Sequence, residues 1–241
     1  LLYQHFEWVY PETMYWGRVK VHEWGGFSTS QMRRDIEAGL FEGWDDPRLP
    51  TISALKNRGI TSEALRQFWI ELGVTQKDIS VPLATLYSHN TKQIDDDAPR
   101  ISFVRNPVKL QITGEHPMTV TTSVHPNHDS MGIRTFDISN HNVLIEKEDS
   151  VKPQVRLKEF ADFDLSGQSA KFMSQARRPI IHWISENDCK KAILIHPSDG
   201  EILEIEGVLE NHEYTPGTML QIERIGYGIL LDDCTIMFTH D

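Results

Sequence analysis

The chain has 241 residues, of which 39% are hydrophobic and 24% are charged, as in a globular protein with one large domain or two to three small ones. Its formal net charge of −11 argues against indiscriminate nucleic-acid binding, which needs a dominating positive field. The same charge leaves room for a local basic groove on an acidic body.

The start of the chain and its two cysteines indicate where the protein works. It begins at Leu1 rather than Met, as expected for a piece of a longer polypeptide. We find no secretory leader and no apolar run near the roughly 18 residues of a membrane span. Cys189 and Cys234 are too few for a disulfide framework or a zinc knuckle, so we expect reduced strand residues in a cytoplasmic protein.

The first quarter of the chain predicts a strand followed by a helix. The stretch YWGRVKVHEWGGFSTS alternates apolar and polar residues, so we expect a strand that ends at its paired glycines. Ser28 and Gln31 then form the pattern of a capping box. Met32, Ile36 and Leu40 repeat at the spacing of one buried helical stripe.

A loop and three short helices are expected next. The stretch EGWDDPRLPTISALKNRGI contains two prolines that fix an extended loop, after which Thr51 can cap a helix through Asn57. Thr61 can cap a second helix, with Trp69 among its apolar face, and Pro82 opens a third. Residues 28–94 should therefore form a small helical unit.

Beyond three consecutive aspartates the pattern changes to short strands. Apolar and polar residues alternate in short runs, and turn residues separate them at intervals of roughly 8–20 residues, which predicts antiparallel barrels or sandwiches. These runs are ISFV from residue 101, VKLQI from 108, VRLKEF from 155, IIHWI from 180, AILI from 192 and MLQIE from 219.

Several longer motifs succeed one another along about 200 residues of the chain: GWDDPRLPTISALKNRGIT, DAPR, NPVKL, HPNHDSMGIR, VRLKEF, IIHWIS and LQIERIGYGILLD. In this order they resemble the C-terminal half of class I aminoacyl-tRNA synthetases of the glutamyl and glutaminyl subfamily. The first motif is long and specific. The compact tail ending in MFTHD resembles archaeal glutamyl enzymes more than bacterial glutaminyl ones.

The resemblance implies an α+β fold that is mainly β, with a helical stem-contact subdomain followed by two antiparallel β-barrels that bind the anticodon. The expected divisions are the end of the catalytic core over 1–30, the helical subdomain over 31–95 and the anticodon-binding domain over 96–241. Within the latter, the proximal barrel is expected over about 96–116 and 213–241, and the distal barrel over about 117–212.

In the family, the acidic tryptophan loop joins the nucleotide-binding core to the anticodon barrels. The resemblance therefore implies that Trp44, Asp45, Asp46 and Arg48 couple two sites and host no chemistry. Both carboxylates can accept hydrogen bonds from loop amides and the start of the following helix, and the indole of Trp44 can be buried to pin the loop. Arg48 can pair with a carboxylate or a phosphate. The alternative is that the charged residues only hold the turn.

The resemblance places a mobile Lys-Met-Ser-Lys-Ser-type loop at Gly26 to Ser30 and leaves the His-rich ATP motif outside the chain. Ser28, Thr29 and Ser30 are then the catalytic candidates, because amides at a helix N-terminus can contact an ATP phosphate. Threonine and Gln31 replace the family's lysines, which puts direct lysine stabilisation of the departing pyrophosphate in doubt. The alternative is a plain capping box.

The resemblance also implies a set of RNA-reading residues: Arg100, Arg156, Lys158, Gln221 and Arg224. The matching positions contact anticodon bases or their phosphates in the glutaminyl relatives. Unstacked bases are read by side-chain hydrogen bonds, for which the planar guanidinium is well shaped. Arg156 and Lys158 alternate along one face of a strand, and Lys158 stands where the relatives have Arg. The alternative for each is a solvated strand residue.

Two other clusters have simpler interpretations. Arg177 and Arg178 are expected to be exposed turn charges. His125 and His128 have a metal-like spacing but no evident third ligand, so we expect a structural turn and no metal site.

The leading hypothesis is the tRNA-binding portion of a glutamyl enzyme. In full length, such an enzyme ligates glutamate to tRNA-Glu through an ATP-derived glutamyl-adenylate with Mg²⁺, and tRNA-Gln is an open second substrate. The fragment alone should be inactive because the glutamate pocket would lie upstream. The alternatives are the same portion of a glutaminyl enzyme or a stand-alone β-barrel interaction module. We expect neither DNA nor a membrane as a partner.

Overall fold

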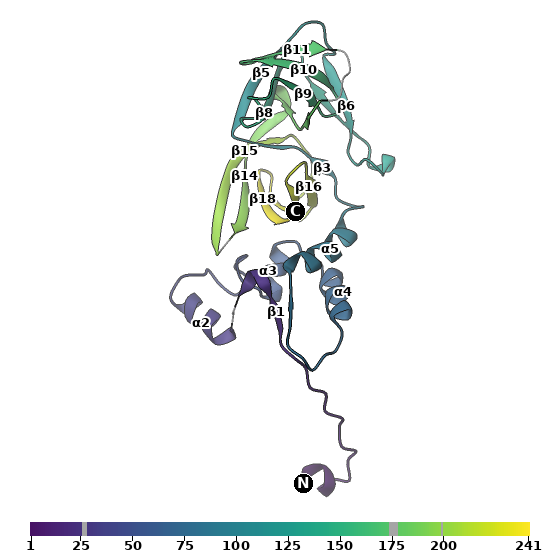
Figure 1. Cartoon of the computed structure of the whole chain (residues 1–241), viewed down its shortest axis with the longest axis vertical. Helices are drawn as coiled ribbons and strands as arrows, with labels where there is room; N and C mark the ends of the chain where they lie inside the picture. The colour runs from purple at the N-terminus through teal and green to yellow at the C-terminus, as the bar shows by residue number, and fades with distance from the viewer. Residues whose placement is uncertain (26–27, 174–177, 199) are drawn as a thin grey trace.

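A computed structural model describes residues 1–25, 28–173, 178–198 and 200–241. Its elements form three bodies along one long axis, with a helical unit at one end, a β-sheet body in the middle and a second β-sheet body at the other end (Figure 1). The N-terminal segment extends away from the helical unit, whereas the C-terminus lies in the middle body (Figure 1). No described helix is long and apolar enough to cross a membrane.

The helical unit confirms the predicted caps. The hydroxyls of Ser28, Thr51 and Thr61 each accept a hydrogen bond from the amide three residues later. The predicted strand of the first quarter forms, but it ends at Val21 and a short helical turn precedes the glycines; it pairs in parallel with a second short strand that was not predicted. The elements of this part are α1 (Leu2–His5), β1 (Val19–Val21), η1 (His22–Trp24), α2 (Thr29–Glu37), α3 (Ile52–Asn57), α4 (Ser62–Leu72), β2 (Ile79–Val81) and α5 (Leu83–Ile94).

Two apolar residues of this unit do not lie where the pattern placed them. Leu40 is exposed because α2 ends at Glu37 and the chain turns away through Gly39, which has a φ of 76°. Trp69 is 44% exposed because its neighbour Phe68 occupies the inward face of α4. Successive helical residues point about 100° apart, so only one of the two can face the core.

The middle body is a seven-stranded sheet in the order β3-β16-β17-β18-β14-β15-β4. Its first and last strands are separated in sequence by Ser102 alone, so the sheet curls back on itself as a barrel. The predicted strands at 101, 192 and 219 lie in it. Its members are β3 (Arg100–Ile101), β4 (Phe103–Arg105), β14 (Cys189–Ser198), β15 (Glu201–Glu210), β16 (Met219–Ile222), β17 (Gly226–Asp232) and β18 (Thr235–His240).

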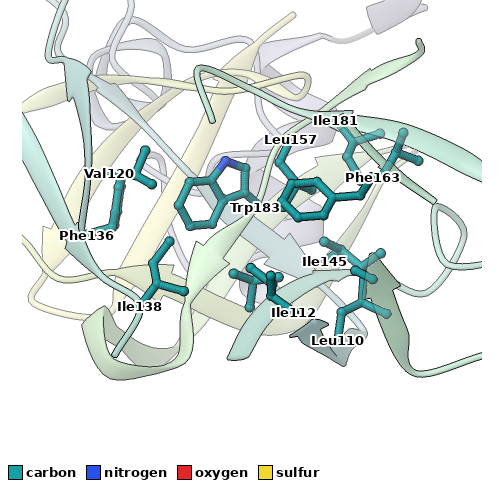
Figure 2. Packing of buried hydrophobic residues seen from close by; sticks show 13 residues of the cluster. Leu110, Ile112, Val120, Phe136, Ile138, Ile145, Leu157, Phe163, Ile181 and Trp183 are labelled. Atoms are coloured by element: carbon teal, nitrogen blue, oxygen red, sulfur yellow. The ribbon is translucent and has the colours of Figure 1, made fainter. Parts of the chain in front are cut away.

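The outer body is also a seven-stranded sheet, in the order β12-β9-β10-β11-β5-β8-β13, with a separate β6-β7 pair beside it. Trp183 lies at the centre of its core, between Phe136 and Phe163, and its ring centroid is 5.2 Å from that of Phe136 (Figure 2). The strands are β5 (Pro107–Thr113), β6 (Thr119–Ser123), β7 (Ile133–Asp137), β8 (Asn142–Glu146), β9 (Gln154–Leu157), β10 (Ala161–Ser166), β11 (Ser169–Met173), β12 (Ile180–Ile181) and β13 (Ile184–Ser185). The short helix η2 (Asp129–Met131) connects β6 to β7, and η3 (Glu186–Asp188) leads from β13 to β14 of the middle sheet.

The strand pairing corrects the predicted bounds of the two barrels. Strands β14 and β15, expected in the distal barrel, pair with β18 and β4 of the middle sheet. Strand β5, expected in the proximal barrel, pairs with β8 and β11 of the outer sheet. The alternation of residues indicates a strand but does not indicate which distant strand it joins.

The cysteine prediction was right for one residue and wrong for the other. Cys189 begins β14, but Cys234 lies in the exposed turn between β17 and β18. Both thiols are free within the described part of the chain.

Candidate nucleic-acid interface

Four of the five predicted RNA-reading residues gather around one turn of the middle sheet. Gln221 on β16 lies opposite Arg100 on β3, and Arg224 follows in the turn toward β17. Lys158 reaches the same turn from the outer sheet, with its Nζ 2.8 Å from Oε1 of Glu223. The turn between β16 and β17 thus brings together residues far apart in the sequence.

Arg100 holds the end of the helical unit. Its guanidinium donates to Oδ1 of Asp95 at 2.7 Å and to the carbonyl of Ala98 at 3.1 Å. The Tyr227 hydroxyl donates to the same Asp95 carboxylate at 2.5 Å. Burial, followed by this hydrogen bond, raises the pKa of Tyr227 to about 12, so the phenol stays a donor at neutral pH.

Arg156 lies on β9 and pairs across the sheet with Asp162 on β10. Its Nε and Nη2 atoms are 2.7 and 3.1 Å from the two carboxylate oxygens. The predicted alternation of Arg156 and Lys158 along one strand is not seen, because β9 ends at Leu157 and Lys158 lies in the turn that follows. Each is already paired with a carboxylate, so RNA would compete for it.

Arg134 is a junction residue that sequence reasoning did not single out. From β7 it donates to both carboxylate oxygens of Glu210 at 2.9 and 2.8 Å, and to Glu223 at 3.2 Å. Its side chain is only 11% exposed. Lys158 and Arg134 therefore share Glu223 and lower its pKa although burial opposes them. The only signal was its position at the end of the HPNHDSMGIR motif.

A second ionic cluster lies behind Arg224. Its Nη1 atom is 2.5 Å from Oδ2 of Asp149, and Lys152 approaches the other oxygen of that carboxylate at 2.5 Å. Arg105 on β4 forms a matching pair with Glu146 on β8, at 2.6 Å from Nε. Both pairs join the middle sheet to the outer one.

A cleft of about 860 Å³ separates the helical unit from the middle sheet. Among the described residues, four arginines line it, from the loop before α3, the end of α3, β4 and the turn after β16, and two acidic residues, Glu23 and Asp241. The arginines are Arg48, Arg58, Arg105 and Arg224. A basic concave surface therefore lies on an acidic chain and connects the β16–β17 turn to the tryptophan loop.

The tryptophan loop is organised by one buried carboxylate. Asp46 accepts hydrogen bonds from the amides of Glu42 and Arg48, each at 3.0 Å, and from the Arg48 guanidinium at 2.6 and 2.9 Å. Arg48 also donates to the carbonyl of Leu40 at 3.0 Å and to that of Gly200, at the tip of the β14–β15 hairpin, at 3.5 Å. The loop thus contacts the middle sheet.

Two details of that loop differ from the prediction. Trp44 is 41% exposed and so is not buried as expected, and its carbonyl accepts a hydrogen bond from the Thr51 hydroxyl. The start of α3 is capped by Thr51 itself, and the exposed Asp45 contributes its carbonyl to Asn57 at 3.4 Å. Thr51 therefore joins the loop to α3 through both its hydroxyl contacts.

The serine segment forms half of the predicted capping box. Ser28 Oγ accepts from the amide of Gln31 at 3.2 Å, but the Gln31 side chain turns forward to Asp35 and does not return to Ser28. Ser28, Thr29 and Ser30 are exposed at the start of α2, whose first turn has no acidic residue. These donors suit one phosphate group, but they supply no carboxylate for Mg²⁺. Gly26 and Phe27 of the expected loop lie outside the described residues.

The histidine motif forms a turn. His125 is fully buried, with Nε2 2.9 Å from the carbonyl of Asp95 and Nδ1 accepting from the amide of Asn127 at 3.1 Å. His128 lies 3.3 Å from Asp96. Within the described ranges, no group of three or more His, Cys, Asp or Glu side chains could hold a metal ion. Arg177 lies outside the described residues.

Comparison with known proteins finds a family match for most of the outer sheet and for the two short strands that precede it. Residues 98–173 match the family described as "tRNA synthetases class I (E and Q), anti-codon binding domain". The chain is also 38% identical to a glutamate–tRNA ligase of Methanosarcina acetivorans over 94% of its own length. The chain is similar to this class I synthetase family over these residues and to its named members over most of its own length.

Two further relatives carry the same name. The glutamate–tRNA ligase of Methanosarcina barkeri is 44% identical over 76% of the chain, and that of Methanococcoides burtonii is 36% identical over 99% of it. The chain spans 41%, 34% and 44% of the lengths of these three proteins. The fold class and the family predicted from the sequence are both confirmed.

Proposed function

We propose that the chain is the tRNA-binding portion of a glutamate–tRNA ligase and that it holds the anticodon loop of tRNA-Glu at the β16–β17 turn. The observation that carries the proposal is the meeting of Arg100, Gln221, Arg224 and Lys158 at this turn. They come from two sheets and three segments of sequence. A surface with mixed donors suits the recognition of unstacked bases in an RNA loop.

The ion pairs at this surface keep the cations in place before RNA arrives. The pairs are Lys158 with Glu223, Arg224 with Asp149 and Arg156 with Asp162. Each RNA phosphate that takes a cation must replace a carboxylate, so binding is selective and salt-sensitive. With a net charge of −11, the rest of the chain repels RNA that lacks the matching loop.

The tryptophan loop connects this surface to the rest of the synthetase. Asp46 fixes Arg48, and Arg48 contacts the tip of the β14–β15 hairpin, so a shift of the middle sheet reaches the start of α3. In the full-length enzyme, Ser28, Thr29 and Ser30 contact a phosphate of ATP, whose Mg²⁺ is held elsewhere. The complete cytoplasmic protein ligates glutamate to tRNA-Glu, and tRNA-Gln is a second substrate to be tested.

Equilibrium binding of the chain to tRNA-Glu tests the proposal. At one salt concentration, transcripts with each anticodon base changed should bind roughly 5- to 150-fold more weakly, because a misread base costs about 1–3 kcal/mol. Replacing Lys158 or Gln221 by Ala should weaken tRNA-Glu binding. The control is Lys191→Ala, an exposed cation of β14 outside the arginine-lined cleft. Equal affinity for all anticodons would refute the proposal.

A further inference from the structure

Arg224 occupies an unusual backbone position for a residue that must be placed accurately. Its φ of 63° lies in the left-handed region that residues other than Gly rarely adopt. Its side chain is 40% exposed and lines the arginine-rich cleft. One face of the guanidinium contacts Asp149, while the same Nη1 atom lies 3.3 Å from Nδ1 of His182.

The contacts of His182 determine its tautomer. The ring lies between β12 and β13 with a side-chain exposure of 1%. Its Nε2 atom is 3.0 Å from the carbonyl of Phe103, which can only accept, so Nε2 carries the hydrogen. The guanidinium of Arg224 has only donors, so Nδ1 must present its lone pair. The ring is therefore neutral and serves Arg224 as a hydrogen-bond acceptor.

The carboxylates near the neutral His182 ring already have cationic partners. Glu146, whose Oε1 is 3.8 Å from Nε2 of His182, is already paired with Arg105. Asp149 is paired with Arg224 itself. Burial is the largest influence on the ring and holds the pKa of His182 below 6.5. The charged groups that face the ring are Glu146, Arg105, Asp149, Glu223 and Arg224.

We propose that His182 is a positioning residue that holds the Arg224 guanidinium in its RNA-reading orientation through the Nδ1 lone pair, and that protonation of the ring releases it. This proposal rests on the proposed tRNA-binding function. A protonated ring would place an Nδ1 hydrogen against the guanidinium, so the hydrogen bond would be replaced by repulsion between two cations. Asp149 alone would then hold Arg224.

The consequence is a loss of anticodon discrimination in mild acid. An added positive charge attracts any RNA, so total affinity is a poor readout. The useful quantity is the ratio between the affinities for tRNA-Glu and for an anticodon-substituted transcript. Because burial lowers the pKa of His182, this ratio should be constant while the ring is neutral and should fall once the pH is low enough to protonate the ring.

Two substitutions separate the two hydrogen bonds of the ring. His182→Asn places an amide oxygen near the position of Nδ1, so it keeps an acceptor for Arg224 but loses the donor to Phe103. His182→Gln places an amide nitrogen near the position of Nε2, so it keeps the donor to Phe103 but offers Arg224 no acceptor. Neither side chain titrates, and thermal unfolding shows whether each variant is folded.

At about pH 7.5, where the ring is neutral, His182→Gln should reduce the discrimination ratio roughly five- to tenfold, and His182→Asn should stay within about twofold of the unmodified chain. On acidification through the protonation of the His182 ring, which nitrogen NMR follows, the ratio of the unmodified chain should fall severalfold, while that of His182→Asn should stay constant. A ratio that does not change with pH in the unmodified chain overturns the proposal. So does normal discrimination by folded His182→Gln.

Nitrogen NMR of the chain labelled at its histidine rings tests the placement without RNA. We expect a His182 ring protonated at Nε2 alone at neutral pH. A ring protonated at Nδ1 overturns the inference even if the chain reads anticodons. A chain with the expected ring state that does not distinguish anticodons would instead refute the proposed function.

Discussion

Asn90 is the side chain that connects α5 to both the α3–α4 turn and the last strand, and replacing it by Ala should loosen the joint between the helical unit and the middle sheet. It is fully buried. Its Oδ1 accepts from the amide of Thr61 at 2.9 Å, and its Nδ2 donates to the carbonyl of Gly59 at 3.2 Å and to Nε2 of His240 at 3.0 Å.

The expected cost follows from these three contacts. A hydrogen bond contributes about 0.5–1.5 kcal/mol net, and a buried group left unpaired costs about 1–3 kcal/mol. Asn90→Ala should therefore lower the free energy of unfolding by about 3 kcal/mol. The control is Asn57→Ala at the end of α3, where an exposed amide makes one long contact of 3.4 Å with Asp45.

Urea denaturation followed by tryptophan fluorescence and circular dichroism measures both variants. Asn57→Ala should stay within about 0.5 kcal/mol of the unmodified chain, as surface substitutions usually do. If Asn90→Ala also stays within about 1 kcal/mol, the three hydrogen bonds do not hold the joint, and the reasoning is refuted.

Three further predictions concern strain, charge and pH. Gly59→Ala should destabilise the chain more than Gly39→Ala in thermal melts. Both glycines have a positive φ, where Ala costs about 1–3 kcal/mol of strain, but only at Gly59 would the added Cβ also lie 2.9 Å from the Thr239 hydroxyl. Equal losses of stability in the two variants would contradict this reasoning. Arg134→Met should cost about 3–5 kcal/mol by leaving two buried carboxylates without their shared partner, and an added Glu210→Gln should recover part of the loss in denaturation experiments; no recovery would exclude a charge effect. Burial is the main cause that lowers the pKa of four histidines, so the unfolded chain binds more protons than the folded chain below pH 6.5. The melting temperature should therefore fall between about pH 7.5 and 5.5. An unchanged melting temperature would contradict the lowered pKa values. These histidines are His182, His196, His212 and His240.

The local chemistry of the helical unit could be predicted from the sequence. Thr51 and Thr61 cap helices because a hydroxyl before a helical run satisfies an amide three residues on, which depends on neighbours alone. Phe68 and Trp69 show where this ends. Both are apolar and adjacent, and only the packed structure decides which one faces inward.

The candidate site residues came from the resemblance, but the sequence did not indicate their geometry. The resemblance supplied Arg100, Lys158 and Arg224, yet their meeting depends on which strands pair across more than a hundred residues of sequence. Strand alternation carries no such information, which is also why β14 and β15 were placed in the wrong barrel. Arg134 and His182 escaped notice because a buried Arg or His gives no distinct local signal.

Site-specific cross-linking from the anticodon loop tests the central claim most directly. A photoreactive uridine at the middle anticodon position of tRNA-Glu, bound to the chain, should label peptides that contain the β16–β17 turn or the Lys158 segment. Labelling should disappear with Lys158→Ala and Gln221→Ala combined, while Lys191→Ala should leave it unchanged. Labelling confined to other faces, or equal labelling by a tRNA with another anticodon, would contradict the account.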